Sequence, residues 1–165
     1  MAGKSQIYLC VCRPDVGFGA YGAFVMDGAF GSTSSFKIKY ELKHDLCDKF
    51  VVYFVSRIAI VYNPAKNRQA FYQGHRMRIS TLARHPTEAI IATGEVNQSP
   101  EIHLWNANTM ETLAILRTAH RGGVLHLEFS RDGSQLVSIG MDISYSMQIF
   151  NWRQERVVAF RNLGK

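Results

Sequence analysis

Six histidines are the residues of this chain most able to do chemistry, because an imidazole can act as a general base or as a metal ligand. They are His44, His75, His85, His103, His120 and His126. Their spacing matches no zinc-ligand pattern. No serine or cysteine stands in a nucleophile motif or beside an obvious base in the sequence. The sequence therefore predicts no catalytic site, no metal site and no enzyme.

One glycine-rich stretch, residues 17–22, matches the G-x-G-x-x-G pattern of dinucleotide-binding turns. A predicted strand over residues 7–12 precedes it, as that pattern requires. Asp27-Gly28 and Gly31-Ser32 then interrupt the helix that would have to aim its N-terminus at a phosphate. We expect a flexible loop here and no nucleotide cofactor, and a nucleotide-dependent enzyme is the weakest of the alternatives.

Positive charge is concentrated in one part of the chain. The net charge is +6, and residues 49–87 contain no acidic residue. The basic residues of that stretch are Lys49, Arg57, Lys66, Arg68, Arg76, Arg78 and Arg84. A stretch of one sign favours an acidic partner, which nucleic acid, an acidic protein surface or an anionic membrane would each supply.

The remaining composition indicates a cytoplasmic globular protein. No apolar run approaches the roughly 18–20 residues that span a bilayer, and the N-terminal apolar stretch is too short for a signal peptide. The three cysteines, Cys10, Cys12 and Cys47, form an odd and sparse set. Such a set is typical of free thiols in a reducing compartment, and we expect no membrane partner.

Three tripeptides with a common pattern organise the chain: an apolar residue, an aromatic residue, then asparagine. They are Val61-Tyr62-Asn63, Leu104-Trp105-Asn106 and Ile149-Phe150-Asn151. The aromatic residues lie 43 and 45 residues apart. A period of about 40–45 residues with an aromatic residue near the end of one strand is typical of WD-type β-propeller blades. The sequence therefore predicts an all-β fold.

Turn residues divide the repeats into units. We expect a partial blade over residues 49–73 and full four-stranded blades over 76–117 and 121–162. Residues 1–48 form an irregular N-terminal segment with one or two strands, at 7–12 and 36–42. A closed propeller needs about four to eight blades. These two and a half blades make an incomplete ring, whose open edges require other assembly proteins or further chain to cover them.

Two groups of side chains have predicted roles in this fold. His75 and His120 precede successive blades, and we expect their imidazoles to lock the blades by bonding within each repeat. The other predicted blade positions are Tyr62, Asn63, Trp105, Asn106, Phe150 and Asn151. Up-and-down topology also sorts the basic residues between the two loop faces. We expect a contact patch of Arg57, Arg76, Arg78 and Arg121, and an opposite basic face of Lys66, Arg68 and Arg84.

Residues 52–63, Val-Tyr-Phe-Val-Ser-Arg-Ile-Ala-Ile-Val-Tyr-Asn, are the start of a more specific likeness. The chain resembles the echinoderm microtubule-associated-protein-like family over about residues 50–162. The other segments that carry the resemblance are 68–69, 72–75, 82–86, 91–96, 102–106 and 149–152. Asn106 and Asn151 stand where the repeats usually have Asp. The family's Tyr-Gly-Tyr-Arg-Gly segment is absent, with residues 40–49 in its place.

The resemblance implies a non-catalytic tandem-propeller protein without a cofactor, which binds tubulin and decorates microtubules in the cytoplasmic cytoskeleton and in some members in cilia or flagella. The first hypothesis is thus a microtubule-associated structural protein with its basic face against tubulin. The alternative is a generic WD-repeat scaffold for other proteins or for RNA. Nucleic acid is the less favoured partner, because Tyr62, Phe71 and Tyr72 occupy strand positions where burial explains them.

Overall fold

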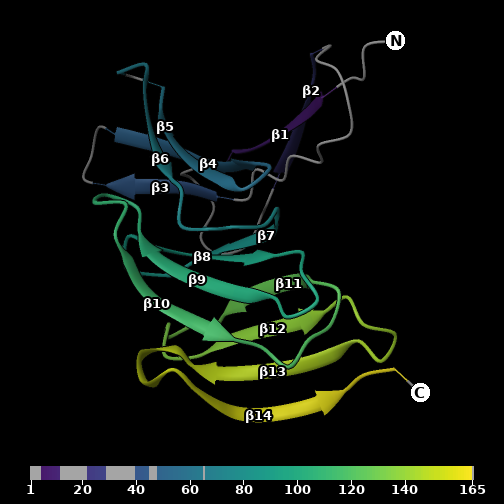
Figure 1. Ribbon diagram of the computed structural model, residues 1–165. Helices are drawn as coiled ribbons and strands as arrows, with labels where there is room; N and C mark the ends of the chain where they lie inside the picture. Colours follow the sequence, from purple (N-terminus) through teal and green to yellow (C-terminus); the bar gives the residue numbers. More distant parts are fainter. Residues whose placement is uncertain (1–4, 12–21, 29–39, 45–47, 65, 165) are drawn as a thin grey trace.

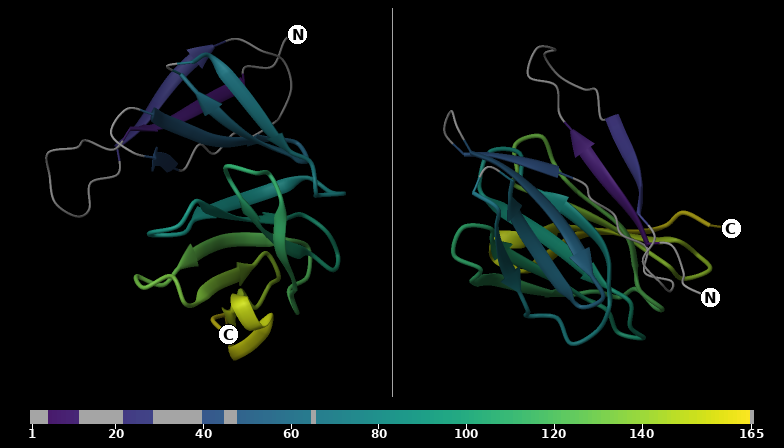
Figure 2. Two further views of the ribbon diagram at one scale, coloured as in Figure 1. Left: turned by 90° about the vertical axis from the view of Figure 1, so that its left-hand side faces the viewer. Right: turned by 90° about the horizontal axis from the view of Figure 1, so that it is seen from above.

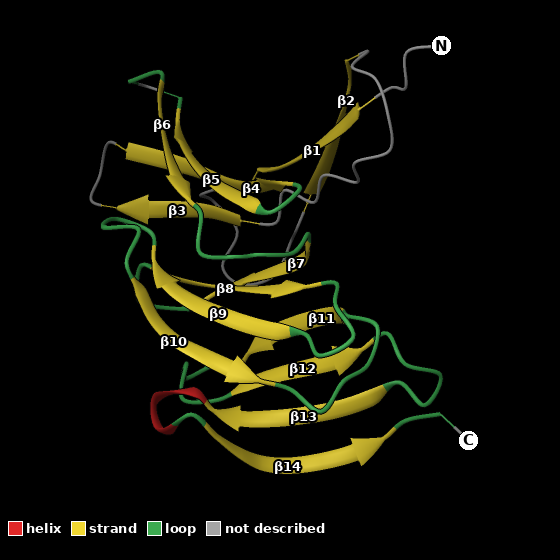
Figure 3. Ribbon diagram, viewed as in Figure 1, coloured by secondary structure: helices red, strands yellow, loops and turns green. Residues whose placement is uncertain are grey.

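The computed structural model describes residues 5–11, 22–28, 40–44, 48–64 and 66–164. Strands dominate this part of the chain, as Figure 3 shows, and form three four-stranded antiparallel sheets and one hairpin. The three sheets follow one another along a curved stack (Figures 1 and 2). Among the described residues they form a partial WD-repeat propeller without a closed ring, as the sequence predicts.

The first sheet contains β3 (Tyr40–His44), β4 (Asp48–Val55), β5 (Ile58–Asn63) and β6 (Arg68–Tyr72), in that order. The sequence predicts this unit as partial and assigns residues 40–48 to the N-terminal segment. The structure instead adds β3 as a fourth strand, paired antiparallel with β4. Strand β3 overlaps the predicted strand 36–42 at residues 40–42. The sequence does not indicate its place in this sheet, because backbone hydrogen bonds make the pairing with β4.

The second and third sheets repeat the same up-and-down order. The second contains β7 (Ile79–Arg84), β8 (Ile90–Glu95), β9 (Glu101–Asn106) and β10 (Thr112–Arg117). The third contains β11 (Val124–Phe129), β12 (Leu136–Gly140), β13 (Ser146–Asn151) and β14 (Arg156–Asn162), with a short 3₁₀ helix, η2 (Trp152–Gln154), before β14. These strands lie within residues 76–117 and 121–162, where the sequence predicts two four-stranded blades.

The N-terminal hairpin pairs β1 (Ser5–Val11) with β2 (Gly22–Gly28). Strand β1 lies where the sequence predicts a strand, apart from Cys12, which is outside the described residues. Strand β2 begins at the last residue of the predicted loop 17–22 and continues through residues for which the sequence predicts no strand. Its central Ala-Phe-Val-Met run favours an extended backbone despite the glycines around it. The first five residues of the glycine-rich motif, 17–21, and predicted strand residues 36–39 lie outside the described part.

Two apolar clusters hold the sheets together. Between the first and second sheets, Val52, Val61 and Tyr72 pack against Ile91 and Trp105. Between the second and third sheets, the cluster includes Ile90, Ala92, Leu104, Leu127, Leu136 and Phe150. Every residue of β8 is buried, because its two faces contact different neighbours. Burial on both faces suits the three β-branched residues of β8, Ile90, Ile91 and Thr93, more than any other strand of this sheet contains.

Sheet topology places successive loops on alternate ends of the strands. The β4–β5, β6–β7, β8–β9, β10–β11 and β12–β13 connections share one end, and the remaining turns share the other. The amide of Ile79 bonds the carbonyl of Ser56 at 2.8 Å, and the amide of Val96 bonds the carbonyl of Arg78 at 2.8 Å. The first bond joins the first sheet to the second, and the second bond joins two loops of the second sheet at the same end. Among the described residues, no helix is long and apolar enough to cross a membrane.

Candidate functional site

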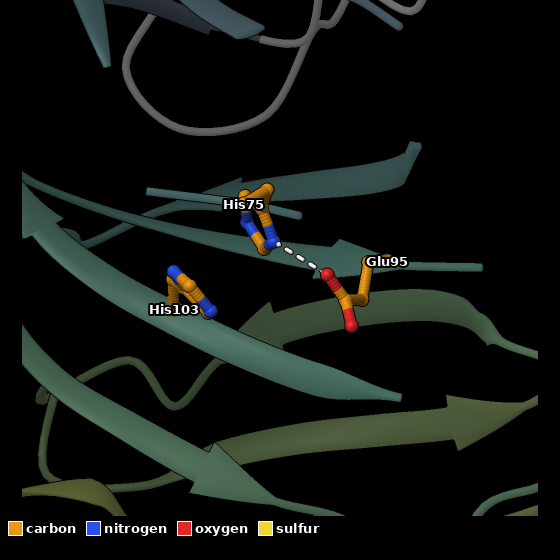
Figure 4. A group of neighbouring side chains, drawn as sticks. All are labelled: His75, Glu95 and His103. Carbon is orange, nitrogen blue, oxygen red and sulfur yellow. Dashed lines mark hydrogen bonds and ion pairs between the residues drawn. The ribbon is translucent and has the colours of Figure 1, made fainter. Parts of the chain in front are cut away.

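A buried chain of hydrogen bonds crosses the second sheet from the indole of Trp105 to the carboxylate of Glu95. Nε1 of Trp105 lies 3.1 Å from the hydroxyl of Thr93, and that hydroxyl lies 2.7 Å from Nε2 of His75. Nδ1 of His75 lies 3.1 Å from the carboxylate of Glu95 (Figure 4). All four residues are buried. These bonds therefore hold the loop that carries His75 against strands β8 and β9. We call this set of hydrogen bonds around His75 a lock.

The chemistry of the groups sets the direction of this chain. The indole of Trp105 can only donate, so it donates to the Thr93 hydroxyl. With a neutral His75 whose Nδ1–H faces Glu95, Nε2 accepts from that hydroxyl, which also lies 3.4 Å from the backbone carbonyl of His103. Nδ1–H of His75 then donates to Glu95. This arrangement requires a neutral imidazole. Burial lowers the pKa of His75 to about 4, with a further lowering by the neighbouring His103, against the opposite influence of Glu95.

The third sheet contains a related lock built around His120. Its Nε2 lies 2.7 Å from the hydroxyl of Ser138, and its Nδ1 lies 2.7 Å from the hydroxyl of Ser146. Ser146 passes the bond on to the carboxylate of Asp142. The buried ring of Phe150 stands where the second sheet has an indole, so Ser138 has no aromatic donor. Burial also lowers the pKa of His120.

The two locks align with a constant offset. His75 and His120, Thr93 and Ser138, and Trp105 and Phe150 are each separated by 45 residues. The two hydroxyl partners, Thr93 and Ser138, are residues that we did not select from the sequence. A hydroxyl side chain in the second strand of both repeats at this offset is the signal that could have identified them.

The second sheet also brings together three side chains that could bind a metal ion, and they come from separate elements: His75, Glu95 and His103. One potential ligand atom from each residue lies within 4.8 Å of the others. The two imidazoles, however, stack with centroids 3.9 Å apart and planes 22° from parallel. An ion in the plane of one ring, where its lone pair points, would lie well outside the plane of the other. We therefore interpret this group as part of the hydrogen-bonded lock.

His103 is the least satisfied member of that group. Its Nδ1 lies 2.9 Å from the hydroxyl of Tyr72, whose ring stacks on Trp105 with centroids 4.6 Å apart. Its Nε2 is buried without a hydrogen-bond partner among the described residues, and the nearest carboxylate oxygen, from Glu101, is 3.7 Å away. Burial lowers the pKa of His103, which keeps this ring neutral beside His75.

The repeated asparagines stabilise turns, whereas the histidines bond within the buried part of each sheet. The side-chain carbonyl of Asn63 accepts the backbone N–H of Lys66, that of Asn106 accepts Thr109, and that of Asn151 accepts Gln154. Each bond spans three residues and closes the turn before the outermost strand of a sheet. Tyr62, in front of the first of these asparagines, bonds the side chain of Asn67 across the same turn. The recurring asparagine is thus a turn cap.

Four exposed arginines lie in the loops of one end of the sheets, which we call the arginine face. It comprises residues 56–57, 73–78, 96–100, 118–123 and 141–145. Its arginines are Arg57, Arg76, Arg78 and Arg121. No ion pair joins their side chains to any residue that the structure describes. The loops of this face contain one acidic residue, Asp142.

Asp142 does little to neutralise these arginines. Its side chain is 15% exposed, and its carboxylate accepts hydrogen bonds from the hydroxyls of Ser144 and Ser146 and from the backbone N–H of Ser146 and Arg121. Burial would raise the pKa of this carboxyl, but these bonds outweigh it and lower the pKa. The Asp142 carboxylate therefore bonds to its own and the neighbouring loop and not to the arginine side chains. The arginine face presents a net positive charge.

The opposite loop face is not basic overall. Among the described residues, its turns contain Lys66, Arg131 and Arg153 together with four acids: Glu88, Glu111, Asp132 and Glu155. Arg153 forms an ion pair with Glu88 from the neighbouring sheet. Of the three residues that we assigned to a secondary basic face, Lys66 and Arg68 are exposed, while Arg84 is only partly exposed. Positive charge thus distinguishes the two faces.

Comparison with known proteins agrees with this architecture. The chain is 29% identical over 115 residues to the 77 kDa echinoderm microtubule-associated protein of Strongylocentrotus purpuratus, a match that covers 64% of this chain and 17% of the relative. It is also 29% identical over 119 residues to human echinoderm microtubule-associated protein-like 2, covering 66% of this chain and 18% of that protein. The chain thus spans less than a fifth of the length of these curated relatives. No family model matches it.

A solved propeller resembles nearly the whole chain. A WD40 propeller chain in a crystal structure of a mitotic checkpoint complex superposes with a TM-score of 0.63 and 19% identity, over 98% of this chain and 45% of that chain. At this identity the likeness concerns the fold alone. The resemblance drawn from the sequence motifs is confirmed: the chain is a partial WD-repeat propeller similar in sequence to the echinoderm microtubule-associated proteins.

Proposed function

We propose that this chain is a non-catalytic, microtubule-associated structural module that binds tubulin through its arginine face. The observation that carries the proposal is the set of four exposed arginines, Arg57, Arg76, Arg78 and Arg121, in loops that share one end of the sheets. An unpaired positive face attracts an acidic surface and speeds the encounter with it. The names of the relatives identify them as microtubule-associated, which makes an acidic microtubule surface the partner of choice.

The module works as part of a larger assembly in the cytoplasmic cytoskeleton, such as a ciliary or flagellar axoneme. The third sheet supports this: Val137, Ile139, Met147 and Ile149 alternate with buried residues along β12 and β13 and remain half-buried on the outer face. A sheet with one partly exposed apolar face is suited to packing against a further sheet or a partner protein. No nucleotide, metal or other cofactor takes part in this function.

A charge-reversal experiment tests the proposal. The double variant Arg76→Glu/Arg78→Glu and the wild type are co-pelleted with stabilised microtubules, and Lys66→Glu/Arg68→Glu on the opposite loop face is the matched control. The proposal predicts strong loss of binding for the first pair and near-wild-type binding for the control. Equal loss for both pairs would indicate non-specific charge attraction, and a folded wild type that stays in the supernatant at low salt would contradict tubulin binding.

The alternative function, a general WD-repeat scaffold for other proteins or RNA, makes different predictions in the same assay. An RNA-binding module would need exposed aromatic rings beside its arginines. Tyr72 is buried, but Phe71, two residues before loop 73–78 of the arginine face, is 47% exposed, and Tyr145 in the β12–β13 loop is 52% exposed. Phe71 is thus not the buried strand residue that the sequence predicts. Exposed rings do not separate the two functions, and the binding assay decides between them. Competition by RNA for microtubule-bound protein, or tight RNA binding in the absence of microtubules, would favour that alternative.

A further inference from the structure

An apolar knob projects from the arginine face. Ile143, in the β12–β13 loop, is 95% exposed, which is far more than any other large apolar residue among those described. Tyr145 and Leu163 beside it are 52% and 55% exposed. The backbone amide of Leu163 bonds the carbonyl of Ser144 at 3.1 Å, so the segment after β14 and the loop form one surface. We call Ile143, Tyr145 and Leu163 the apolar knob.

The loop that carries the knob is held in one conformation. The carboxylate of Asp142 accepts the hydroxyl of Ser144 at 2.7 Å and the backbone N–H of Ser146 at 2.9 Å. The amide of Tyr145 closes a turn onto the carbonyl of Asp142, with Tyr145 at a φ of 44°. A left-handed tyrosine is costly and persists only where surrounding contacts impose it. A loop ordered before binding loses little conformational entropy when a partner covers it.

Positive charge adjoins the knob directly. The backbone N–H of Arg121 donates to the carboxylate of Asp142, and the amide of Met141 bonds the carbonyl of Gly123 at 2.9 Å. The exposed guanidinium of Arg121 is therefore carried by a segment bonded to the loop of Ile143. A rigid apolar anchor with an aromatic residue and an arginine beside it has the composition of a binding hot spot.

We propose that the apolar knob inserts into an apolar pocket bordered by carboxylates on the microtubule surface, with Arg121 pairing at the pocket rim. The inference rests on the proposed function and adds the apolar part of the interface to its charged part. Charge complementarity selects an acidic partner, since the loops around the knob contain no acid other than the internally bonded Asp142. The contact supplies the salt-insensitive share of the affinity, because burial of apolar surface does not depend on ionic screening.

The test compares Ile143→Ser with Ile115→Ser, a matched control on the outermost strand β10, where Ile115 is 42% exposed. Dissociation constants are measured on microtubules across a salt series. Loss of a buried isoleucine predicts binding about tenfold weaker or more for Ile143→Ser at every salt concentration. The salt dependence stays as in the wild type, Ile115→Ser binds normally, and Ile143→Leu retains most of the affinity.

The outcomes separate the two proposals. Salt-dependent wild-type binding that Ile143→Ser leaves unchanged overturns the apolar knob and leaves the arginine face standing. Equal weakening by Ile143→Ser and Ile115→Ser also overturns it, because the effect would then be general. Absence of wild-type binding overturns both proposals. Thermal unfolding of each variant, which we expect to match the wild type because both side chains are exposed, excludes misfolding as a cause.

Discussion

His75 and Thr93 form the central contact of the second sheet, with Nε2 and the hydroxyl oxygen 2.7 Å apart. The same contact at the same distance joins His120 and Ser138 in the third sheet. Since both pairs are buried, the loop that leads into each of these two sheets is fixed by a neutral imidazole, which is bonded to a hydroxyl on the second strand of the same sheet, β8 or β12. The repeat is thus specified by polar contacts as well as by its apolar period.

Removal of His75 should be more harmful than removal of His120. His75→Ala removes the hydrogen bond that the neutral imidazole donates to the buried Glu95 carboxylate and leaves it a 3.5 Å bond from Asn97, which predicts a loss of about 3 kcal/mol or more in the free energy of unfolding. His120→Ala removes the bonds to Ser138 and Ser146 but leaves Asp142 its own hydrogen bonds, and it predicts a loss of about 1–3 kcal/mol. Urea titrations of the two variants measure the difference. An equal or reversed order would contradict the role assigned to Glu95.

Two glycines with positive φ should respond differently to alanine. At Gly133, with φ 74°, a Cβ would lie 2.1 Å from Nε2 of His85, whereas at Gly122, with φ 83°, the nearest atom is 4.0 Å away. Gly122→Ala should cost only the left-handed backbone penalty, about 1–2 kcal/mol. Gly133→Ala adds a clash with a buried ring, for a total of about 2–5 kcal/mol.

The Gly133 carbonyl explains why that site cannot easily adjust. It accepts Nε2–H of His85 at 3.1 Å and Nε1–H of Trp152 at 2.7 Å, which joins the second sheet to the third. Thermal unfolding of both alanine variants measures the comparison. Similar losses for Gly122→Ala and Gly133→Ala would mean that His85 moves aside without cost and that this inter-sheet contact is weak.

Stability should fall as the pH is lowered through the weakly acidic range. In the folded protein His75 remains neutral down to its pKa of about 4, while an unfolded histidine takes up a proton near pH 6.5. Between these values the unfolded state binds more protons. The contribution of His75 is therefore fully present above about pH 6.5 and lost by about pH 4, and it amounts to about 3 kcal/mol.

Burial lowers the pKa values of His85, His103 and His120 as well, so their contributions have the same sign. Urea unfolding at intervals from pH 7.5 to pH 4 measures the total, and His75→Gln should flatten the curve because it removes one titrating group. A free energy of unfolding that stays constant over this range, or the same slope in His75→Gln, would contradict the neutral locks.

The regular part of the fold follows from the sequence because local signals agree there. Strands β7 and β10 cover the residues that the apolar pattern predicts, and the aromatic-asparagine tripeptides mark β5, β9 and β13. A strand is predicted over residues 36–42, which overlaps β3, but its pairing with β4 in the first sheet has no signal in the sequence. Strand β2 is not predicted, because of the glycines around it.

The polar contacts were harder to predict than the strands. His75 and His120 stood out because each precedes a blade, but their partners Thr93, Glu95 and Ser138 are ordinary strand residues in the sequence. The stack of His103 on His75 depends on strand register and on a loop that returns across the sheet. The type of a single residue does not predict these polar contacts, because they form only when two separate elements pack together.

Amide hydrogen exchange of the chain, free and bound to microtubules, tests the central claim most directly. The account predicts that binding slows exchange in the loops of the arginine face, above all in residues 73–78 and 118–123, and leaves residues 85–89, 107–111 and 130–135 unchanged. Protection confined to those opposite turns, or pelleting with no protection of the arginine loops, would contradict binding through the arginine face.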